Sequence, residues 1–326
     1  MAKSAFVTGG TGFIGINLVK QLVDQGWKVT ALHRPTSDLS TLRTLPVDLV
    51  EGSITNLSSL QNAIPKDTDV VFHLAGDTNM WSQNNDRQTE VNVTGTKNMV
   101  QASVEKNVET FIHTSSVSAW GKVKGTISEE TPQQGNDSWV NYERTKWLSE
   151  REALKACDHD IKAVIMNPAM VVGPHDANNW GRLFFALRDN NLPGVTRGNM
   201  SIAHVKEVAK AHISAVEQGS DGERYILGGQ HCTFADFVSI IADVSDISAQ
   251  PKTIPTPVLK LVANFKSAIS YFTGREPDLT PELVKLMTRN VIYSSDKAKS
   301  ELGYRILPVK KSVHDCHQWL VQEELL

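Results

Sequence analysis

The stretch Thr8-Gly9-Gly10-Thr11-Gly12-Phe13-Ile14-Gly15 decides the fold. It joins an apolar run at 4–8, which has the length and composition of a strand, to a segment at 12–25 whose apolar residues recur at helical spacing. A glycine-rich turn between a strand and a helix lets the backbone approach a phosphate group closely. The stretch therefore predicts a dinucleotide-binding unit at the start of the chain.

Each glycine of this turn has its own task in such a unit. Gly9 permits the tight turn, Gly12 lets the backbone reach the pyrophosphate, and Gly15 lets the helix pack against the sheet. The amides at the start of the helix, those of Phe13 and Ile14, then face the phosphates at the positive end of the helix dipole. We predict that all five residues bind the cofactor.

Short apolar runs alternate with helix-length segments through the first half of the chain. Strands separated by helical connections form right-handed crossovers and hence a parallel sheet. We therefore predict an α/β fold with a Rossmann-type doubly wound parallel sheet. The predicted strands are 4–8, 28–32, 48–51, 70–73, 110–114 and 162–166, and the clearest helices are 12–25, 86–106 and 138–156.

The alternation of apolar runs with helix-length segments ends after Pro168. Glycine, proline and asparagine gather in two stretches that predict loops, and from Thr233 onward the pattern is mostly helical. We predict a dinucleotide-binding domain at 1–166, with returning segments near 200–228. A smaller, mostly helical substrate-binding lobe is expected from 167–199 and 229–326.

The residues after the second predicted strand indicate which dinucleotide fits. They read Leu32-His33-Arg34-Pro35, with no acid in the window. An NAD-binding protein usually places Asp or Glu there to accept a hydrogen bond from the ribose 2′-hydroxyl. A carboxylate repels the 2′-phosphate of NADP, whereas a guanidinium binds it through charge-assisted hydrogen bonds. Arg34 could be a solvated loop residue, but the pattern favours NADP, as NADPH, over NAD.

The predicted helix 138–156 contains Tyr142-Glu143-Arg144-Thr145-Lys146. A spacing of four brings the side chains of Tyr142 and Lys146 to one face of the helix. An ammonium beside a phenol lowers the phenol pKa toward neutrality, which a general acid or base requires. The pair is a candidate for proton transfer.

Two serines, Ser115 and Ser116, follow the predicted strand 110–114. They lie at the carboxyl end of a parallel strand, where open α/β sheets bind their ligands. A hydroxyl there could hydrogen-bond a substrate carbonyl oxygen and share its charge with Tyr142. Ordinary turn chemistry would also place serines at this position.

Taken in order, the motifs resemble those of the extended (atypical) short-chain dehydrogenases/reductases, in the NAD-dependent epimerase/dehydratase superfamily. The likeness covers residues 1 to about 218, and beyond that only length and helicity agree. The motifs that carry it are TGGTGFIG at 8–15, HLAG at 73–76, VNVTGT around Asn92, TSSVSAWG at 114–121, YERTK at 142–146, NPAMVVGP at 167–174 and HVKEVAKAH at 204–212.

The resemblance implies a role for each site residue. Tyr142 would be the acid/base, Lys146 would hold the ribose and lower the Tyr142 pKa, and Ser116, rather than Ser115, would polarise the carbonyl. The chain departs from the family at Ser53, where an aspartate is common, which weakens one adenine contact. The cofactor-binding residues that the resemblance implies, besides the glycine turn and Arg34, are Ser53, Ile54, Leu74, Ala75, Gly76, Tyr142, Lys146, Pro168 and Val171.

The likeness leaves three functions open. The first is an NADPH-dependent reductase of an aldehyde or ketone, similar to dihydroflavonol-4-reductase-like enzymes. The second is a nucleotide-sugar epimerase that uses bound NAD, and the third is a non-catalytic dinucleotide-binding regulatory protein. Sugar dehydratases carry an Asp-Glu pair after the active-site hydroxyl, where this chain has Val117-Ser118. Epimerases show an arginine-acid pair before the HV motif, where this chain reads Asn199-Met200-Ser201-Ile202-Ala203-His204. Both departures favour the reductase.

Bulk properties limit the possible partners. A formal charge of −3 and a pI near 6.4 give no electrostatic reason to expect nucleic acid or a membrane. The N-terminus has no apolar signal core, and three cysteines without metal-like spacing suit a reducing compartment, so we expect a cytoplasmic protein. We expect no metal and a small-molecule carbonyl substrate, and the resemblance to the family implies a homodimer.

Overall fold

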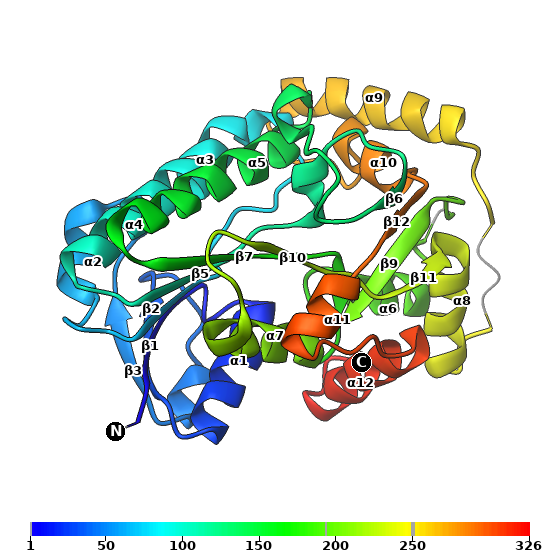
Figure 1. Cartoon of the computed structure of the whole chain (residues 1–326). Coiled ribbons are helices and arrows are strands. Elements are labelled where there is room, and N and C mark those ends of the chain that lie inside the picture. The colour runs from blue at the N-terminus through cyan, green and yellow to red at the C-terminus, as the bar shows by residue number, and fades with distance from the viewer. Residues whose placement is uncertain (1, 193, 249–251) are drawn as a thin grey trace.

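The main sheet of the protein is parallel and has seven strands. The computed structural model describes residues 2–192, 194–248 and 252–326. The strands lie in the order β10-β7-β5-β4-β1-β2-β3, so the chain winds outward in both directions from the middle of the sheet (Figure 1). This is the predicted Rossmann-type doubly wound fold. The strands are β1 Ser4–Thr8, β2 Lys28–His33, β3 Val47–Glu51, β4 Val70–His73, β5 Thr110–Thr114, β7 Lys162–Pro168 and β10 Arg224–Leu227.

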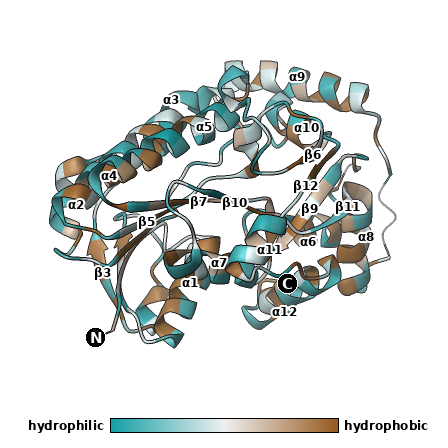
Figure 2. Cartoon of the chain, in the orientation of Figure 1, coloured by the Kyte–Doolittle hydropathy of each residue, from teal (hydrophilic) through white to brown (hydrophobic). Residues whose placement is uncertain are grey.

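All six strands predicted in the first half of the chain are present. Three have the predicted bounds, and the other three differ by one or two residues at one end. The central strands are buried almost throughout, because helices cover both faces of the sheet. Figure 2 shows them as a largely hydrophobic band through the middle of the molecule.

Helices cover the two faces of the sheet. On one face α1 (Phe13–Asp24) packs against α7 (Val205–Gln218), and α11 (Asp296–Leu302) lies beside α7. The other face carries α2 (Leu57–Ala63), α4 (Gly95–Glu105) and α5 (Asn141–Leu154). Helices therefore cover both apolar faces of the sheet. The edge formed by the carboxyl ends of the strands is where a ligand can bind.

The predicted helix 86–106 consists of three consecutive segments. These are α3 (Asn85–Thr89), a π-helical stretch (Glu90–Thr94) and α4. Asn92 lies in this wider turn, and its side chain is buried. Helix α2 was not predicted, because seven residues are too few to show a helical period.

The second lobe begins where β7 ends. Its three-stranded sheet has the order β11-β9-β8, and β6 pairs with β12 separately. One apolar cluster joins α8 and α12 to this sheet, and α9 packs on α10 (Figure 1). Among the described residues no helix is both long and apolar enough to cross a membrane. The elements are β6 Gly125–Ile127, β8 Met170–Val172, β9 Asn199–His204, β11 Gln230–Thr233, β12 Val291–Tyr293, α6 Arg182–Arg188, α8 Phe234–Val244, α9 Thr256–Thr273, α10 Pro281–Met287 and α12 Val309–Gln322.

The turn between β1 and α1 leaves no room for side chains at two of its glycines. Gly9 has a φ of 71°, and a Cβ there would lie 2.7 Å from the amide nitrogen of Ala75. A Cβ on Gly15 would lie 2.0 Å from the carbonyl oxygen of Gly9, inside the turn itself. At Gly10, by contrast, a Cβ would meet only side chains, the nearest at 3.5 Å.

This difference predicts that two substitutions in the same turn have very different effects on stability. Gly15→Ala should lower the free energy of unfolding by about 1–3 kcal/mol, because backbone must move to admit the methyl group. Gly10→Ala should change it by less than about 0.5 kcal/mol, because the new contacts are ordinary van der Waals contacts. Urea unfolding of both variants checks this. Equal stability of the two variants would show that the turn is looser than described.

Candidate active site

The amino end of α1 offers free backbone donors. The residue before the helix, Gly12, has no side chain to cap it, and the first turn contains no acidic residue. No side chain in the described parts of the chain bonds these first amides, those of Phe13, Ile14 and Gly15. Unpaired donors and the positive end of the helix dipole suit an anionic group such as a pyrophosphate. The turn therefore fits the cofactor that its sequence predicts.

The segment after β4 lies directly against this turn. Leu74 donates its amide to the carbonyl oxygen of Thr8 at 3.1 Å, and Ala75 donates to the Thr8 hydroxyl at 3.2 Å. The side chain of Lys146 reaches the same place, since its Nζ is 3.4 Å from the position that a Cβ on Gly76 would take. The structure thus brings together residues predicted from three separate motifs.

Lys146 is buried on the inner face of α5. Its Nζ donates to the backbone oxygen of Thr114, the last residue of β5, at 3.1 Å and lies 5.9 Å from the centre of the Tyr142 ring. Burial lowers the pKa of Lys146 to about 8, although the nearby Glu150 carboxylate raises it. The ammonium is therefore placed between the phenol and the strand ends.

Tyr142 differs from its sequence-based expectation in one respect. Burial raises the pKa of its phenol, a side-chain hydrogen bond with Ser116 lowers it, and the charge of Asp77 raises it further. The net shift of the Tyr142 pKa in the free protein is therefore upward, opposite to the predicted direction, because desolvation is the largest effect here. The phenol is protonated at neutral pH, which is the form that can donate a proton.

The two serines after β5 have separate surroundings. Ser116 precedes a short helical turn, accepts a hydrogen bond from the amide of Ser118 at 3.1 Å and interacts with Tyr142. Ser115 instead donates to the buried carboxylate of Glu150 at 2.6 Å. The geometry agrees with the prediction that Ser116, rather than Ser115, faces the site.

Glu150 is the centre of a buried polar cluster beneath the site. Besides Ser115, it accepts hydrogen bonds from Asn167 at 2.6 Å, from Gln133 at 2.7 Å and from Arg224 at 2.7 Å. These partners come from β7, from a loop and from β10, so one carboxylate joins α5 to two neighbouring strands. The cluster fixes the helix that carries Tyr142 and Lys146.

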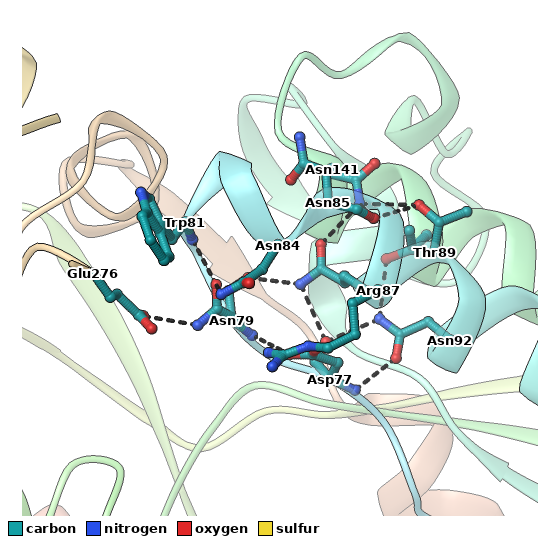
Figure 3. A network of polar contacts seen from close by, with 12 residues as sticks. Asp77, Asn79, Trp81, Asn84, Asn85, Arg87, Thr89, Asn92, Asn141 and Glu276 are labelled. Carbon is teal, nitrogen blue, oxygen red and sulfur yellow. Dashed lines mark hydrogen bonds and ion pairs between the residues drawn. The ribbon is translucent and has the colours of Figure 1, made fainter. Parts of the chain in front are cut away.

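A second polar network holds the segment that follows β4 (Figure 3). The Asn92 side chain accepts from the amide of Asp77 at 2.7 Å and donates to its carbonyl oxygen at 2.9 Å, while also donating to Thr145 of α5 at 3.1 Å. Arg87 pairs with the Asp77 carboxylate at 2.9 Å. Asn141, beside Tyr142, donates to the backbone oxygen of Asn85 at 3.0 Å. The π-helical stretch therefore links α5 to the segment after β4.

The remaining predicted cofactor residues lie farther along the carboxyl edge of the sheet. Arg34 follows β2 and is exposed. Ser53 follows β3, where its hydroxyl is 2.9 Å from that of Thr55, and the Ile54 side chain is buried in the core. The last two predicted residues, Pro168 and Val171, lie at the end of β7 and in β8.

Sequence reasoning missed Glu143, the residue after Tyr142. Its carboxylate is buried and accepts from Ser138 at 2.5 Å and from Lys285 at 3.1 Å, and it also pairs with Arg289. Both cations belong to the second lobe, so these ion pairs attach that lobe to α5. The pairing spans more than 140 residues, and no local pattern in the sequence could reveal it.

The fold and the site define a protein of the extended short-chain dehydrogenase/reductase class. Residues 5–228, more than half of the chain, match the family model described as "NAD dependent epimerase/dehydratase family". The chain therefore belongs to that family, as its motifs indicate.

Three known proteins show how far the likeness extends. The chain is 29% identical to a "Putative dihydroflavonol 4-reductase" of Synechocystis sp., over 98% of this chain and 95% of that protein. It is 25% identical to "Sterol demethylase protein B" of Methylococcus capsulatus, over 99% and 100% of the two chains. The crystal structure of gox2253 is 31% identical over 99% of both chains, with a TM-score of 0.85.

The Glu150 cluster predicts a large effect of a single substitution on stability. Glu150→Ala should lower the free energy of unfolding by about 3 kcal/mol, because it leaves Arg224 without its partner and buried polar groups without an acceptor. Chemical denaturation monitored by circular dichroism measures this change. On the same helix, Glu152→Ala removes only a surface pair with Lys155 and should cost less than about 0.5 kcal/mol. A cost at Glu150 no larger than at Glu152 would contradict the cluster's role.

Proposed function

We propose that the protein is an NADPH-dependent reductase of an aldehyde or ketone. The observation that carries this proposal is the convergence of Ser116, Tyr142 and Lys146 at the carboxyl edge of the sheet, beside the glycine turn. Open parallel sheets bind ligands at this edge. A hydroxyl, a protonated phenol and an ammonium are together a set that can polarise and protonate a carbonyl oxygen.

In the proposed reaction Tyr142, Ser116 and Lys146 each have a separate role. When bound, NADPH supplies a hydride to the carbonyl carbon. Tyr142, protonated because burial raises its pKa, transfers its proton to the carbonyl oxygen as negative charge develops there. The Ser116 hydroxyl holds that oxygen by a hydrogen bond. Lys146 holds the ribose of the cofactor and stabilises the phenolate that remains.

The surroundings of Ser116 support a reductase over an elimination enzyme. The residues after Ser116, Val117 to Trp120, form a buried turn that contains no carboxylate. Elimination needs an additional acid and base close to the substrate, and this turn offers neither. The name of one similar protein, "Putative dihydroflavonol 4-reductase", also supports a reductase.

Arg34 supports the choice of NADPH. It is exposed just after β2, and no acidic side chain pairs with it within the described residues. An unpaired guanidinium at this position suits the 2′-phosphate of NADPH.

The choice of cofactor can be tested by substitution of Arg34. Wild type should bind NADPH more tightly than NADH, and Arg34→Ala should lose about ten- to a hundredfold of its NADPH affinity with little change for NADH. Fluorescence titration of both cofactors measures this, with Arg275→Ala as a distant control. Equal affinities in wild type would remove the argument and favour the NAD-using epimerase.

The proton donor provides the direct test of the reaction. Tyr142→Phe keeps the ring and removes the hydroxyl, so turnover with NADPH and a reactive carbonyl should fall at least about a hundredfold, while NADPH affinity changes little. Ser116→Ala should also lower turnover with the cofactor still bound. Loss of NADPH absorbance against a panel of aldehydes and ketones provides the assay, and Tyr271→Phe, on the exposed side of α9, is the matched control.

Two results would overturn the proposal. One is near-normal turnover of Tyr142→Phe with a substrate that wild type reduces. The other is purified protein that retains nearly one NAD per chain, as seen by native mass spectrometry, and interconverts sugar nucleotides without net consumption of cofactor. The second result would establish the epimerase instead. Tight dinucleotide binding with no turnover of any kind would favour the regulatory alternative.

A further inference from the structure

Helix α9 has one buried face and one exposed apolar face. Its buried residues, among them Leu259 and Ala263, pack on α10. On the outward face Leu261 is 72% exposed, Phe265 67% and Phe272 87%. Of the eleven large apolar side chains exposed in the described residues, seven belong to α9, so this is a concentrated patch rather than ordinary scatter. The seven are Val258, Leu261, Val262, Phe265, Ile269, Tyr271 and Phe272.

The exposed residues form a continuous stripe along the helix. Positions 258, 261, 262, 265, 269 and 272 recur at three- and four-residue intervals, which places them on one side over the length of α9. The helix lies at the outer edge of the molecule, away from the main sheet, in Figures 1 and 2. It has no glycine, and its single proline is in the first turn, so the stripe is not interrupted.

The charge around this stripe is opposite in sign to that of the whole chain. From residue 247 to residue 275 the sequence contains no aspartate or glutamate but has Lys252, Lys260, Lys266 and Arg275, whereas the chain as a whole carries a net charge of −3. Acidic residues resume at 276, and Asp278 pairs with Lys266 at 2.7 Å. An apolar stripe flanked by bases is the composition of helices that lie in the interface of anionic bilayers.

The same helix borders the candidate active site. Ser270 accepts a hydrogen bond from the indole of Trp81 at 3.2 Å, and Glu276, just after α9, accepts one from Asn79 at 2.7 Å (Figure 3). Both donors lie in the segment that follows β4 and continues from Asp77. On the other side, Trp139, 58% exposed just before α5, lines a cavity of about 760 Å³ that Lys260 also lines. The apolar stripe thus lies on the outside of an element that borders the site.

We propose that the exposed face of α9 binds the interface of an anionic lipid bilayer, with the helix lying parallel to the membrane plane. The buried second face and the lysines prevent a spanning arrangement, in agreement with the absence of a membrane-crossing helix among the described residues. A second copy of the chain is the alternative occupant of this face, and the test below separates it from a bilayer. The proposal departs from the expectation, drawn from net charge, of no membrane partner, since a sum over the whole chain hides a local excess of bases.

The test measures binding of the full chain to vesicles without substrate or turnover. Wild type should cosediment with phosphatidylglycerol-containing vesicles at low salt, and much less with pure phosphatidylcholine or at high salt. Replacing Leu261 and Phe265 together by serine should weaken binding at least about tenfold, because two large side chains no longer enter the interface. Val321→Ser removes an exposed apolar group from α12 instead, and this variant should bind as wild type does.

Lys260→Glu offers an independent variant, which should weaken binding to anionic vesicles and leave the chain folded. The melting temperature and NADPH affinity of every variant verify folding, since all four positions replaced are exposed. Failure of wild type to bind anionic vesicles would overturn the proposal. So would binding that neither α9 variant weakens, or light scattering that shows a dimer which the double variant dissociates. None of these results depends on whether the protein is a reductase.

Discussion

Close contact between two backbone segments is the constraint on which the rest of the structure depends. The turn at Gly9 and the segment at Ala75 lie so near each other that no side chain fits between them, and hydrogen bonds from Leu74 and Ala75 to Thr8 hold the two together. Because β1 and β4 are neighbours at the middle of the sheet, this contact lies where the direction of winding reverses. Free helix amides, the ends of the strands and the buried ammonium all meet around it.

Holding α5 in register is the second requirement of the site. A phenol and an ammonium four residues apart keep a fixed geometry toward a ligand only if their helix keeps its position relative to the strand ends. Two buried carboxylates on α5, Glu143 and Glu150, achieve this in different directions. Glu150 attaches the helix to β7 and β10, and Glu143 attaches it to the second lobe. Desolvation of these charges is costly, and multiple hydrogen bonds at each carboxylate offset that cost.

Much of the fold and part of the site could be predicted from the sequence, because their signals are local. The glycine turn, the apolar strands and the Tyr142–Lys146 spacing each lie within a few residues. What escaped prediction depends on distant partners or on burial. Residues far apart in sequence pair as β6 and β12, and the π-helical turn that buries Asn92 has no periodic signature. The pKa of Tyr142 was predicted in the wrong direction, because spacing reveals the nearby ammonium but not the loss of water around the phenol.

The ion pairs at Glu143 have a consequence for how this architecture can be recombined. The nucleotide-binding part and the second lobe are not modules joined by a passive linker, since the residue next to Tyr142 obtains its countercharges from Lys285 and Arg289. A chimera that takes its last hundred residues from another protein inherits a buried anion next to Tyr142. Such a hybrid must also inherit cations at these two positions. Exchange of substrate lobes between relatives is therefore restricted by charge matching, in addition to the shape of the joined surfaces.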